Sequence, residues 1–244
     1  MDFLSPEGLR LDGRRALELR QLQAEVGVVE KADGSATFEM GNTKVIAVVY
    51  GPREVQNRNQ QQHDQALVRC EYSMASFSTG DRRRRGKGDR RATELSLVIR
   101  QTMEAAILTN LLPRSQIDIF VQVLQADGGT RACCINAATL ALADAGIPMR
   151  DIIVSCAAGY LNSTPILDLN YLEDSGGGPD LTVALFPKLN KVSLLQMDSK
   201  IPIDVFEKVM SLASEGARTV AQFIKETLME NTTQLALAKG PPKF

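Results

Sequence analysis

The stretch Leu124–Asp151, LQADGGTRACCINAATLALADAGIPMRD, decides the fold of this 244-residue chain. It begins at the end of an alternating apolar run, Ile117–Leu124, whose period of two predicts a β-strand. The glycines Gly128 and Gly129 then lead into apolar residues spaced three and four apart, which predict a helix over Arg131–Ala145. The sequence therefore predicts a strand, a tight glycine turn and a packed helix in succession.

Further strands and helices are predicted on both sides of this unit. Periodicity, β-branched residues and stop signals place strands at Thr43–Tyr50 and Ile152–Tyr160, a hairpin at Leu181–Phe186 and Val192–Met197, and helices at Leu95–Leu111 and from Asp204 onward. No linker rich in Pro, Gly or Ser divides these elements. We therefore expect one α/β or α+β domain made of two similar halves.

The composition excludes several classes of protein. With 44% apolar and 23% charged residues, the chain is typical of a globular protein rather than a disordered or fibrous one. Four cysteines without CxxC spacing and a single histidine, His63, argue against a zinc cluster or a disulfide framework. Neither a run of about 18 apolar residues nor a signal-peptide pattern occurs, so we expect a soluble protein inside the cell.

The turn before the central helix is a candidate phosphate site. Gly129 lets the backbone approach a ligand, and the following helix offers free N–H groups at the positive end of its dipole. Thr130 adds a hydroxyl group, and the planar guanidinium of Arg131 matches phosphate oxygens. Neither a Walker motif nor GxGxxG is present, and a purely structural glycine turn stays open as the alternative.

Two acidic residues flank a glycine-rich loop. Asp174 and Asp180 lie on either side of Ser175–Pro179, whose three glycines allow a tight turn that aims both carboxylates at one place. Paired carboxylates suit Mg²⁺ coordination or general-acid chemistry. A solvated acidic turn is the alternative.

The third candidate is a basic loop. Residues 81–91, DRRRRGKGDRR, hold seven bases and two acids, a net charge of +5. Arg90 and Arg91 are placed to hold a nucleic-acid backbone, while Arg82 and Arg83 supply a more diffuse attraction. A solvated loop would explain the run on its own, but a phosphate cradle, a carboxylate pair and basic residues together are what phosphoryl transfer on a nucleic acid requires.

Several motifs resemble the RNase PH family, and within it the catalytic-type RNase-PH-like ring subunits of the RNA exosome. The loops are similar to those of eukaryotic, plant-like members. The similarity extends from Ser5 to Glu230 and is carried by Ser5–Arg15 (SPEGLRLDGRR), Ala32–Pro52, Phe77–Arg83, Leu124–Asp151 and Leu167–Asp174 (LDLNYLED).

The resemblance implies an α+β architecture, the RNase PH fold of the ribosomal protein S5 domain 2-like type. Two βαβα-type halves, about 20–120 and 121–235, form a single RNase PH-like domain over residues 1–235, followed by a flexible tail at 236–244. It also implies a hexameric ring with other RNase-PH-like subunits and RNA-binding cap subunits around a channel for single-stranded RNA, and no membrane contact.

The resemblance further implies a 3′-to-5′ exoribonuclease that uses inorganic phosphate as co-substrate, requires Mg²⁺ and releases nucleoside diphosphates. By motif, Asp174 is the catalytic acid and Asp180 the second carboxylate, and both are candidate metal ligands. The phosphate residues are Gly129, Thr130 and Arg131, and the RNA-binding residues are Arg90, Arg91, Arg82 and Arg83.

The family role implied is RNA degradation, ribosomal RNA processing and messenger RNA decay in the nucleus, the nucleolus and the cytoplasm. Two alternatives stay open. One is an inactive structural ring subunit that binds RNA and threads it to a separate hydrolytic nuclease. The other is a stand-alone homohexamer that trims transfer RNA and forms from this chain alone. For the exosome enzyme, the resemblance implies an active site shared with a neighbouring ring subunit, so activity is expected to require that partner.

Overall fold

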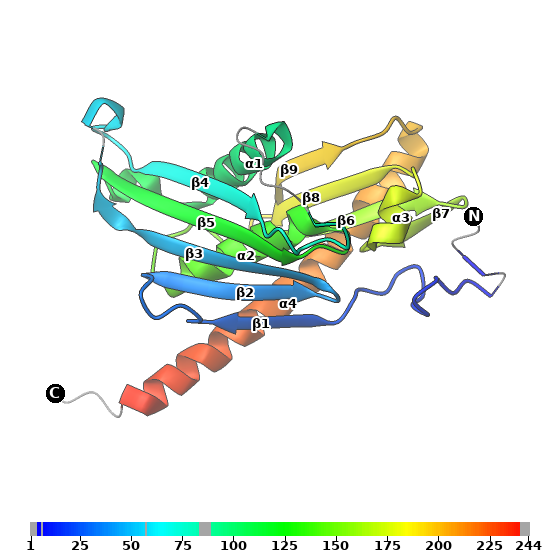
Figure 1. The fold of residues 1–244 in the computed structure, drawn as a ribbon, viewed down its shortest axis with the longest axis horizontal. Helices are drawn as coiled ribbons and strands as arrows, with labels where there is room; N and C mark the ends of the chain where they lie inside the picture. The colour runs from blue at the N-terminus through cyan, green and yellow to red at the C-terminus, as the bar shows by residue number, and fades with distance from the viewer. Residues whose placement is uncertain (1–3, 6, 57, 83–88, 240–244) are drawn as a thin grey trace.

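The first half of the molecule is a five-stranded sheet (Figure 1). The computed structural model describes residues 4–5, 7–56, 58–82 and 89–239. The strand order is β1-β2-β3-β5-β4, and all neighbours are antiparallel except the parallel pair β4 and β5. The strands are β1 (Leu22–Val26), β2 (Gly34–Met40), β3 (Thr43–Glu54), β4 (Leu67–Met74) and β5 (Ser115–Gln125).

Two of these strands were predicted from their patterns. Thr43–Tyr50 lies within β3, and Ile117–Leu124 lies within β5, whose residues Ile117, Ile119 and Val121 are buried on one face as alternation requires. The strands β1, β2 and β4 escaped prediction because polar and small residues interrupt their apolar patterns. A 3₁₀ turn, η1 (Arg58–Gln60), lies between β3 and β4.

The helix α2 (Thr130–Asp144) is the centre of the core. It contacts β2 and β3 of the first sheet and β6 of the second. Every residue from Ala132 to Leu142 is buried, including the side chains of Cys133 and Cys134. The helix is therefore buried on all sides rather than along one face, because it is enclosed by two sheets.

The helix α1 (Arg90–Ala106) ends earlier than its periodicity predicted. At Ile107 the backbone becomes extended and pairs with Met149, while the N–H of Arg150 donates to the Ala106 carbonyl oxygen at 2.8 Å. A 3₁₀ turn, η2 (Thr109–Leu111), follows. Bonding to this distant segment replaces the next helical turn, and sequence periodicity does not report such a partner.

The second half is a four-stranded antiparallel sheet in the order β7-β6-β8-β9. It confirms the predicted strand and hairpin and adds two elements that were missed, β7 and α3. The long helix α4 packs on β6 and β8 (Figure 1). The bounds are β6 (Val154–Leu161), β7 (Thr164–Leu167), α3 (Tyr171–Ser175), β8 (Asp180–Phe186), β9 (Lys191–Met197) and α4 (Ile203–Lys239).

Two predicted boundaries need correction. The division expected at residues 120 and 121 falls inside β5, which pairs along its length within the first sheet. Residues 236–239, expected to belong to a flexible tail, continue helix α4 instead; residues 240–244 lie outside the described part of the chain. The expected α+β fold itself is confirmed.

Two further observations bear on the chain's chemistry. In the described part of the chain, no helix combines the length and hydropathy that crossing a membrane requires. All four cysteines are free thiols, and three of them are buried among apolar side chains.

Candidate active site

The glycine turn joins β5 to α2 in a conformation that only glycine accepts easily. Gly128 has φ 72° and Gly129 has φ 61°, both in the left-handed region. A Cβ atom on Gly128 would lie 2.5 Å from the Leu169 carbonyl oxygen, so the turn packs directly against the start of α3. The first N–H groups of α2, from Thr130 onward, lack acceptors within the helix and point out of its N-terminus.

Arg131 lies in the first turn of α2, next to these N–H groups. Its Nε atom is buried and has no hydrogen-bond partner among the described residues. Since buried polar groups are almost always hydrogen-bonded in folded proteins, an unpartnered guanidinium nitrogen here is suited to a ligand acceptor. A phosphate oxygen meets that requirement.

The short helix α3 presents Asp174. Its N-cap residue, Asn170, accepts a hydrogen bond from the N–H of Glu173 at 3.0 Å, and the Glu173 carboxylate accepts one from the N–H of Asn170 at 3.0 Å. This reciprocal capping box fixes the helix. Glu173 points inward and is buried, whereas Asp174 remains exposed to solvent and to any substrate.

Asp180 begins β8 and pairs with Gly159 of β6. Its Oδ1 atom is buried without a hydrogen-bond partner in the described part of the chain. Asp198 follows β9 and donates its backbone N–H to the carbonyl oxygen of Asp180 at 3.2 Å. The hairpin therefore brings a third carboxylate to the same edge.

The electrostatics join these residues into one cluster. Burial, followed by the charges of Asp174 and Asp198, raises the pKa of Asp180 to about 7, and the charge of Arg131 acts in the opposite direction. Burial also raises the pKa of Asp174, with Arg91 and Arg131 acting to lower it and Asp198 to raise it. Cations from α1 and α2 thus face carboxylates from α3, β8 and the end of β9.

Most of the predicted site residues meet here. The turn residues Gly129 and Thr130 adjoin Arg131, and the field of Asp174 includes Arg91 as well as Arg131. Arg90 lies beside Arg91 as the first residue of α1, where Asp89 caps the helix by accepting the Arg91 N–H at 3.1 Å. Two predicted RNA-binding residues are not brought into the cluster: Arg82 is exposed on the preceding loop, and Arg83 lies outside the described residues.

Sequence reasoning missed Asp198 and the arginines behind the site. The register of the predicted hairpin would have indicated Asp198, because Leu181 pairs with Met197 and the next residues outward are Asp180 and Asp198. Arg10 and Arg20 carried no local signal, since both pair with residues about 150 positions away in the sequence.

The two predicted carboxylates fit Mg²⁺ by their chemistry. Mg²⁺ is commonly held by one or two carboxylates, with water and substrate phosphates completing the octahedron. The unpartnered Asp180 Oδ1 and the nearby Asp174 carboxylate satisfy that donor set. Within the described residues, no group of three or more His, Cys, Asp or Glu side chains is arranged to hold a metal ion, so water and substrate phosphates would have to supply the remaining ligands.

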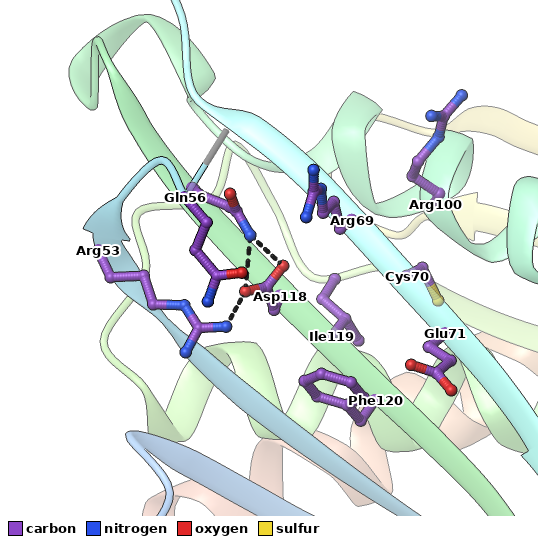
Figure 2. Close-up of a pocket in the computed structure, with 10 residues that line it drawn as sticks. Arg53, Gln56, Arg69, Cys70, Glu71, Arg100, Asp118, Ile119 and Phe120 are labelled. Atoms are coloured by element: carbon purple, nitrogen blue, oxygen red, sulfur yellow. Dashed lines mark hydrogen bonds and ion pairs between the residues drawn. The ribbon is translucent and has the colours of Figure 1, made fainter. Parts of the chain in front are cut away.

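A cavity of about 520 Å³ lies away from this cluster, over the other end of β5 (Figure 2). There the Asp118 carboxylate accepts hydrogen bonds from Arg53 and from Gln116 Nε2, the latter at 2.7 and 2.9 Å. Unpartnered buried atoms occur here too, among them Arg53 Nε and Arg100 Nε. Such atoms alone do not define the active site; the convergence of carboxylates, arginines and a helix N-terminus does.

Comparison with known proteins assigns the sequence of this chain to a family. Residues 18–148 match the 3′ exoribonuclease family, domain 1, and residues 151–216 match domain 2 of the same family. The chain belongs to this family, the RNase PH family. The resemblance inferred from the sequence motifs is thereby confirmed.

Relatives within the RNase PH family are similar over nearly the whole chain. The exosome complex component RRP41 homolog of Arabidopsis thaliana is 73% identical over 96% of this chain and 98% of its own length. RRP41 of Homo sapiens is 51% identical over 98% of each chain, and Rrp41 of Thermococcus onnurineus is 47% identical over 98% of this chain and 96% of its own.

The fold is also similar to that of a solved structure. Rice (Oryza sativa) Rrp46 superposes with a TM-score of 0.79 over 90% of this chain and all of its own. At 23% identity this similarity concerns the fold alone.

Proposed function

We propose that this chain is a ring subunit of the RNA exosome that degrades and processes single-stranded RNA from its 3′ end by phosphorolysis. The observation that carries the proposal is the convergence of Arg131, at the N-terminus of α2, with Asp174 and Asp180. The relatives whose names identify them as exosome components support the assembly.

Inorganic phosphate is the attacking group. Free N–H groups at the start of α2 and the guanidinium of Arg131 bind its oxygens, which orients one of them toward the terminal phosphodiester of the RNA. Arg91, and Arg90 beside it, offset the charge of the RNA backbone and of the transition state. The new P–O bond forms in line as the bond from phosphorus to the penultimate 3′ oxygen breaks.

Asp174 donates the proton that the leaving 3′ oxygen takes up. It is accessible to the RNA, and burial raises its pKa above the ordinary value of an aspartate, which favours the protonated form that a general acid requires. The products are a nucleoside diphosphate and an RNA one nucleotide shorter with a 3′ hydroxyl group. Asp180, with Asp174, would hold Mg²⁺, which supplies charge stabilisation to the phosphoryl oxygens when bound.

The proposed setting follows from the exosome assembly. The partners are other RNase-PH-like ring subunits, RNA-binding cap subunits and single-stranded RNA. The compartments are the nucleus, the nucleolus and the cytoplasm, where ribosomal RNA is processed and messenger RNA decays. Tagging the chain and imaging it beside a nucleolar marker tests the compartments directly.

The proposed activity is tested on the chain co-expressed with its ring partners. End-labelled single-stranded RNA and Mg²⁺ are supplied with or without inorganic phosphate, and the released nucleotides are identified. We expect phosphate-dependent shortening with nucleoside diphosphate products, abolished by Asp174→Asn.

The matched control is Glu230→Gln, which makes the same carboxylate-to-amide change on the exposed, C-terminal part of α4 that projects beyond the sheets (Figure 1). The control should retain wild-type activity. An assembled ring that binds RNA but gives no phosphate-dependent product contradicts the proposal. That result favours the structural ring subunit that passes RNA to a separate nuclease.

A further inference from the structure

The segment that precedes β1 passes behind the candidate active site and is tied into it by buried charges. Arg10 and Arg20 are 4% and 7% exposed, and their partners Glu173 and Asp168 are 1% and 0% exposed. Both partners belong to the second half of the molecule. The N-terminal segment therefore connects the two halves at the site.

Arg20 holds the glycine turn. Its Nε donates to Asp168 Oδ2 at 2.9 Å and its Nη2 to Asp168 Oδ1 at 2.7 Å, which is a bidentate pair. The same guanidinium donates to the carbonyl oxygens of Asp127 and Gly128, the latter at 3.3 Å. These two carbonyls fix the peptide planes that lead directly into the N-terminus of α2.

Thr43 completes this arrangement from β3. Its hydroxyl group donates to the Gly128 carbonyl oxygen at 2.7 Å and accepts from the Asp127 N–H at 3.1 Å. It also accepts from Arg20 Nη1 at 3.2 Å. The turn is thus held from two sides by side chains that do not themselves face the ligand position.

Arg10 holds α3. Its Nε donates to Glu173 Oε1 at 2.7 Å, and its Nη2 donates to Glu173 Oε2. Further bonds run from Nη1 to the Leu167 carbonyl oxygen at 2.6 Å and from Nη2 to that of Asp168 at 2.9 Å. Because Glu173 also closes the capping box, Arg10 fixes the helix on which the next residue is Asp174.

A contribution to folding stability does not by itself explain why the buried ion pairs Arg20–Asp168 and Arg10–Glu173 are present. Desolvating a buried ion pair costs about as much as the pair gains, and apolar residues of similar volume often serve the fold equally well. What a bidentate pair with further backbone bonds does provide is a fixed geometry. A displacement of about 1 Å at a reacting group can reduce turnover about a hundredfold.

We propose that Arg20 and Arg10 are positioning residues of this site: Arg20, through Asp168, sets the phosphate-binding turn, and Arg10, through Glu173, sets Asp174. The inference rests on the proposed phosphorolytic function. It assigns a role to Arg10, which precedes the part of the chain that matches the family from residue 18 onward.

The roles proposed for Arg20 and for Arg10 predict different kinetic effects in the assembled ring. Arg20→Lys should raise the KM for phosphate about tenfold or more while kcat changes little, because the phosphate cradle is displaced. Arg10→Lys should lower kcat about tenfold at an unchanged KM for phosphate, because the proton donor is displaced. The turnover number is expressed per ring that binds RNA, because a merely structural role would only reduce each variant's active fraction. On that scale a merely structural role would leave both kcat and the KM for phosphate at the wild-type values.

The matched control is Arg53→Lys, which alters another ion pair, with Asp118, at the opposite end of β5 (Figure 2). It should leave both constants unchanged. Two milder variants serve if a lysine substitution prevents folding. Thr43→Val removes the hydroxyl that holds Gly128 and should repeat the KM effect, and Asn170→Ala loosens the cap of α3 and should repeat the kcat effect.

Phosphate binding measured without turnover separates this inference from the proposed function. The rise in melting temperature with added inorganic phosphate is compared in the wild-type ring and the variants. A wild-type rise that Arg20→Lys and Thr43→Val both lose supports the inference, and a rise that both retain overturns it. Absence of any rise, with no nucleoside diphosphate released, overturns the proposed function and the inference with it.

Discussion

The two sides of the glycine turn treat charge in opposite ways. Behind the turn, Arg20 and Asp168 are buried and fully hydrogen-bonded to each other and to the backbone. In front of it, Arg131 Nε and Asp180 Oδ1 are buried without partners in the described part of the chain. Satisfied charges fix geometry, whereas unsatisfied charges are poised for a ligand.

This difference explains why the site needs both halves of the chain. The anion-binding side comes from α2, at the end of the first sheet, and the carboxylates come from α3 and β8 in the second half. Arg20 bonds to both halves. Because its hydrogen bonds hold the glycine turn in place, Arg131 and Asp180 on the other side of the turn stay apart instead of moving together to form an ion pair.

The largest expected effect comes from removing the cation in front of the turn. Arg131→Gln should lower turnover by a factor of about 100–1000, the range found when a charge-stabilising donor is removed from an active site. Weak phosphate binding should persist, because the N–H groups of α2 remain. The measurement is nucleoside diphosphate release by the assembled ring.

Arg218→Gln is the control for this substitution, since Arg218 lies exposed on α4 and bonds only to Asn190 Oδ1, at 3.0 Å, among the contacts described. It should keep wild-type turnover. Near-normal turnover by Arg131→Gln would contradict the claim that the unpartnered charges in front of the turn bind the ligand.

The next effect concerns the turn itself. Gly128→Ala forces an alanine into the left-handed region and against the Leu169 and Asn170 backbone, so the free energy of unfolding should fall by about 3–4 kcal/mol. Gly146→Ala is the matched control: its φ is 68°, but open space surrounds its Cβ position, so about 1–2 kcal/mol is expected. Urea unfolding of the full chain measures both, and equal losses would contradict the close packing.

A smaller effect is expected from Asp180, whose buried carboxylate has no hydrogen-bond partner at Oδ1 among the described residues and should lower the free energy of unfolding when it is ionised. The folded-state pKa of Asp180 is about 7, above the unfolded value of 3.8, so its protonated form stabilises the fold at low pH. That contribution is lost as pH rises from about 4 through about 7. Asp180→Asn should therefore unfold less readily than wild type at pH 8, by on the order of 1–3 kcal/mol, with little difference at pH 4.

Urea midpoints measured across this pH range, with a chelator present, give the comparison. The wild-type chain should lose stability relative to Asp180→Asn as pH rises. Parallel curves of stability against pH for the two proteins would show that the pKa of Asp180 is the same in the folded and unfolded states, which contradicts the prediction.

The smallest expected effect tests whether Asp198 interacts electrostatically with Asp174 and Asp180. Asp198→Asn removes a negative charge that raises the pKa of both Asp174 and Asp180, so the pH dependence of stability should move to lower pH. The same urea series detects the movement. An unmoved midpoint would exclude Asp198 from the cluster.

The sequence predicted well those features whose information is local. Alternation of apolar residues predicted β5, and two apolar runs around a turn predicted the hairpin β8–β9. The residue types and positions of Gly128, Gly129 and Arg131 predicted the phosphate-binding turn. The carboxylates Asp174 and Asp180 were predicted from a short spacing, and the structure brings both near Arg131.

What the sequence could not provide depends on contacts between distant segments. The end of α1 is set by bonding to Met149 and Arg150, and Arg10 is buried only because Glu173 meets it across 163 positions. Charged residues are normally exposed, so their burial has no sequence signal until the partner is known. Helix α3 has only five residues and is too short for periodicity to predict.

The most direct test of the central claim follows the atoms of the attacking phosphate. The assembled ring is given single-stranded RNA, Mg²⁺ and inorganic phosphate labelled with heavy oxygen, and the first released nucleotide is weighed by mass spectrometry. The account predicts a nucleoside diphosphate whose terminal phosphate carries the label. An unlabelled nucleoside monophosphate, or RNA bound without any nucleotide released, would contradict it.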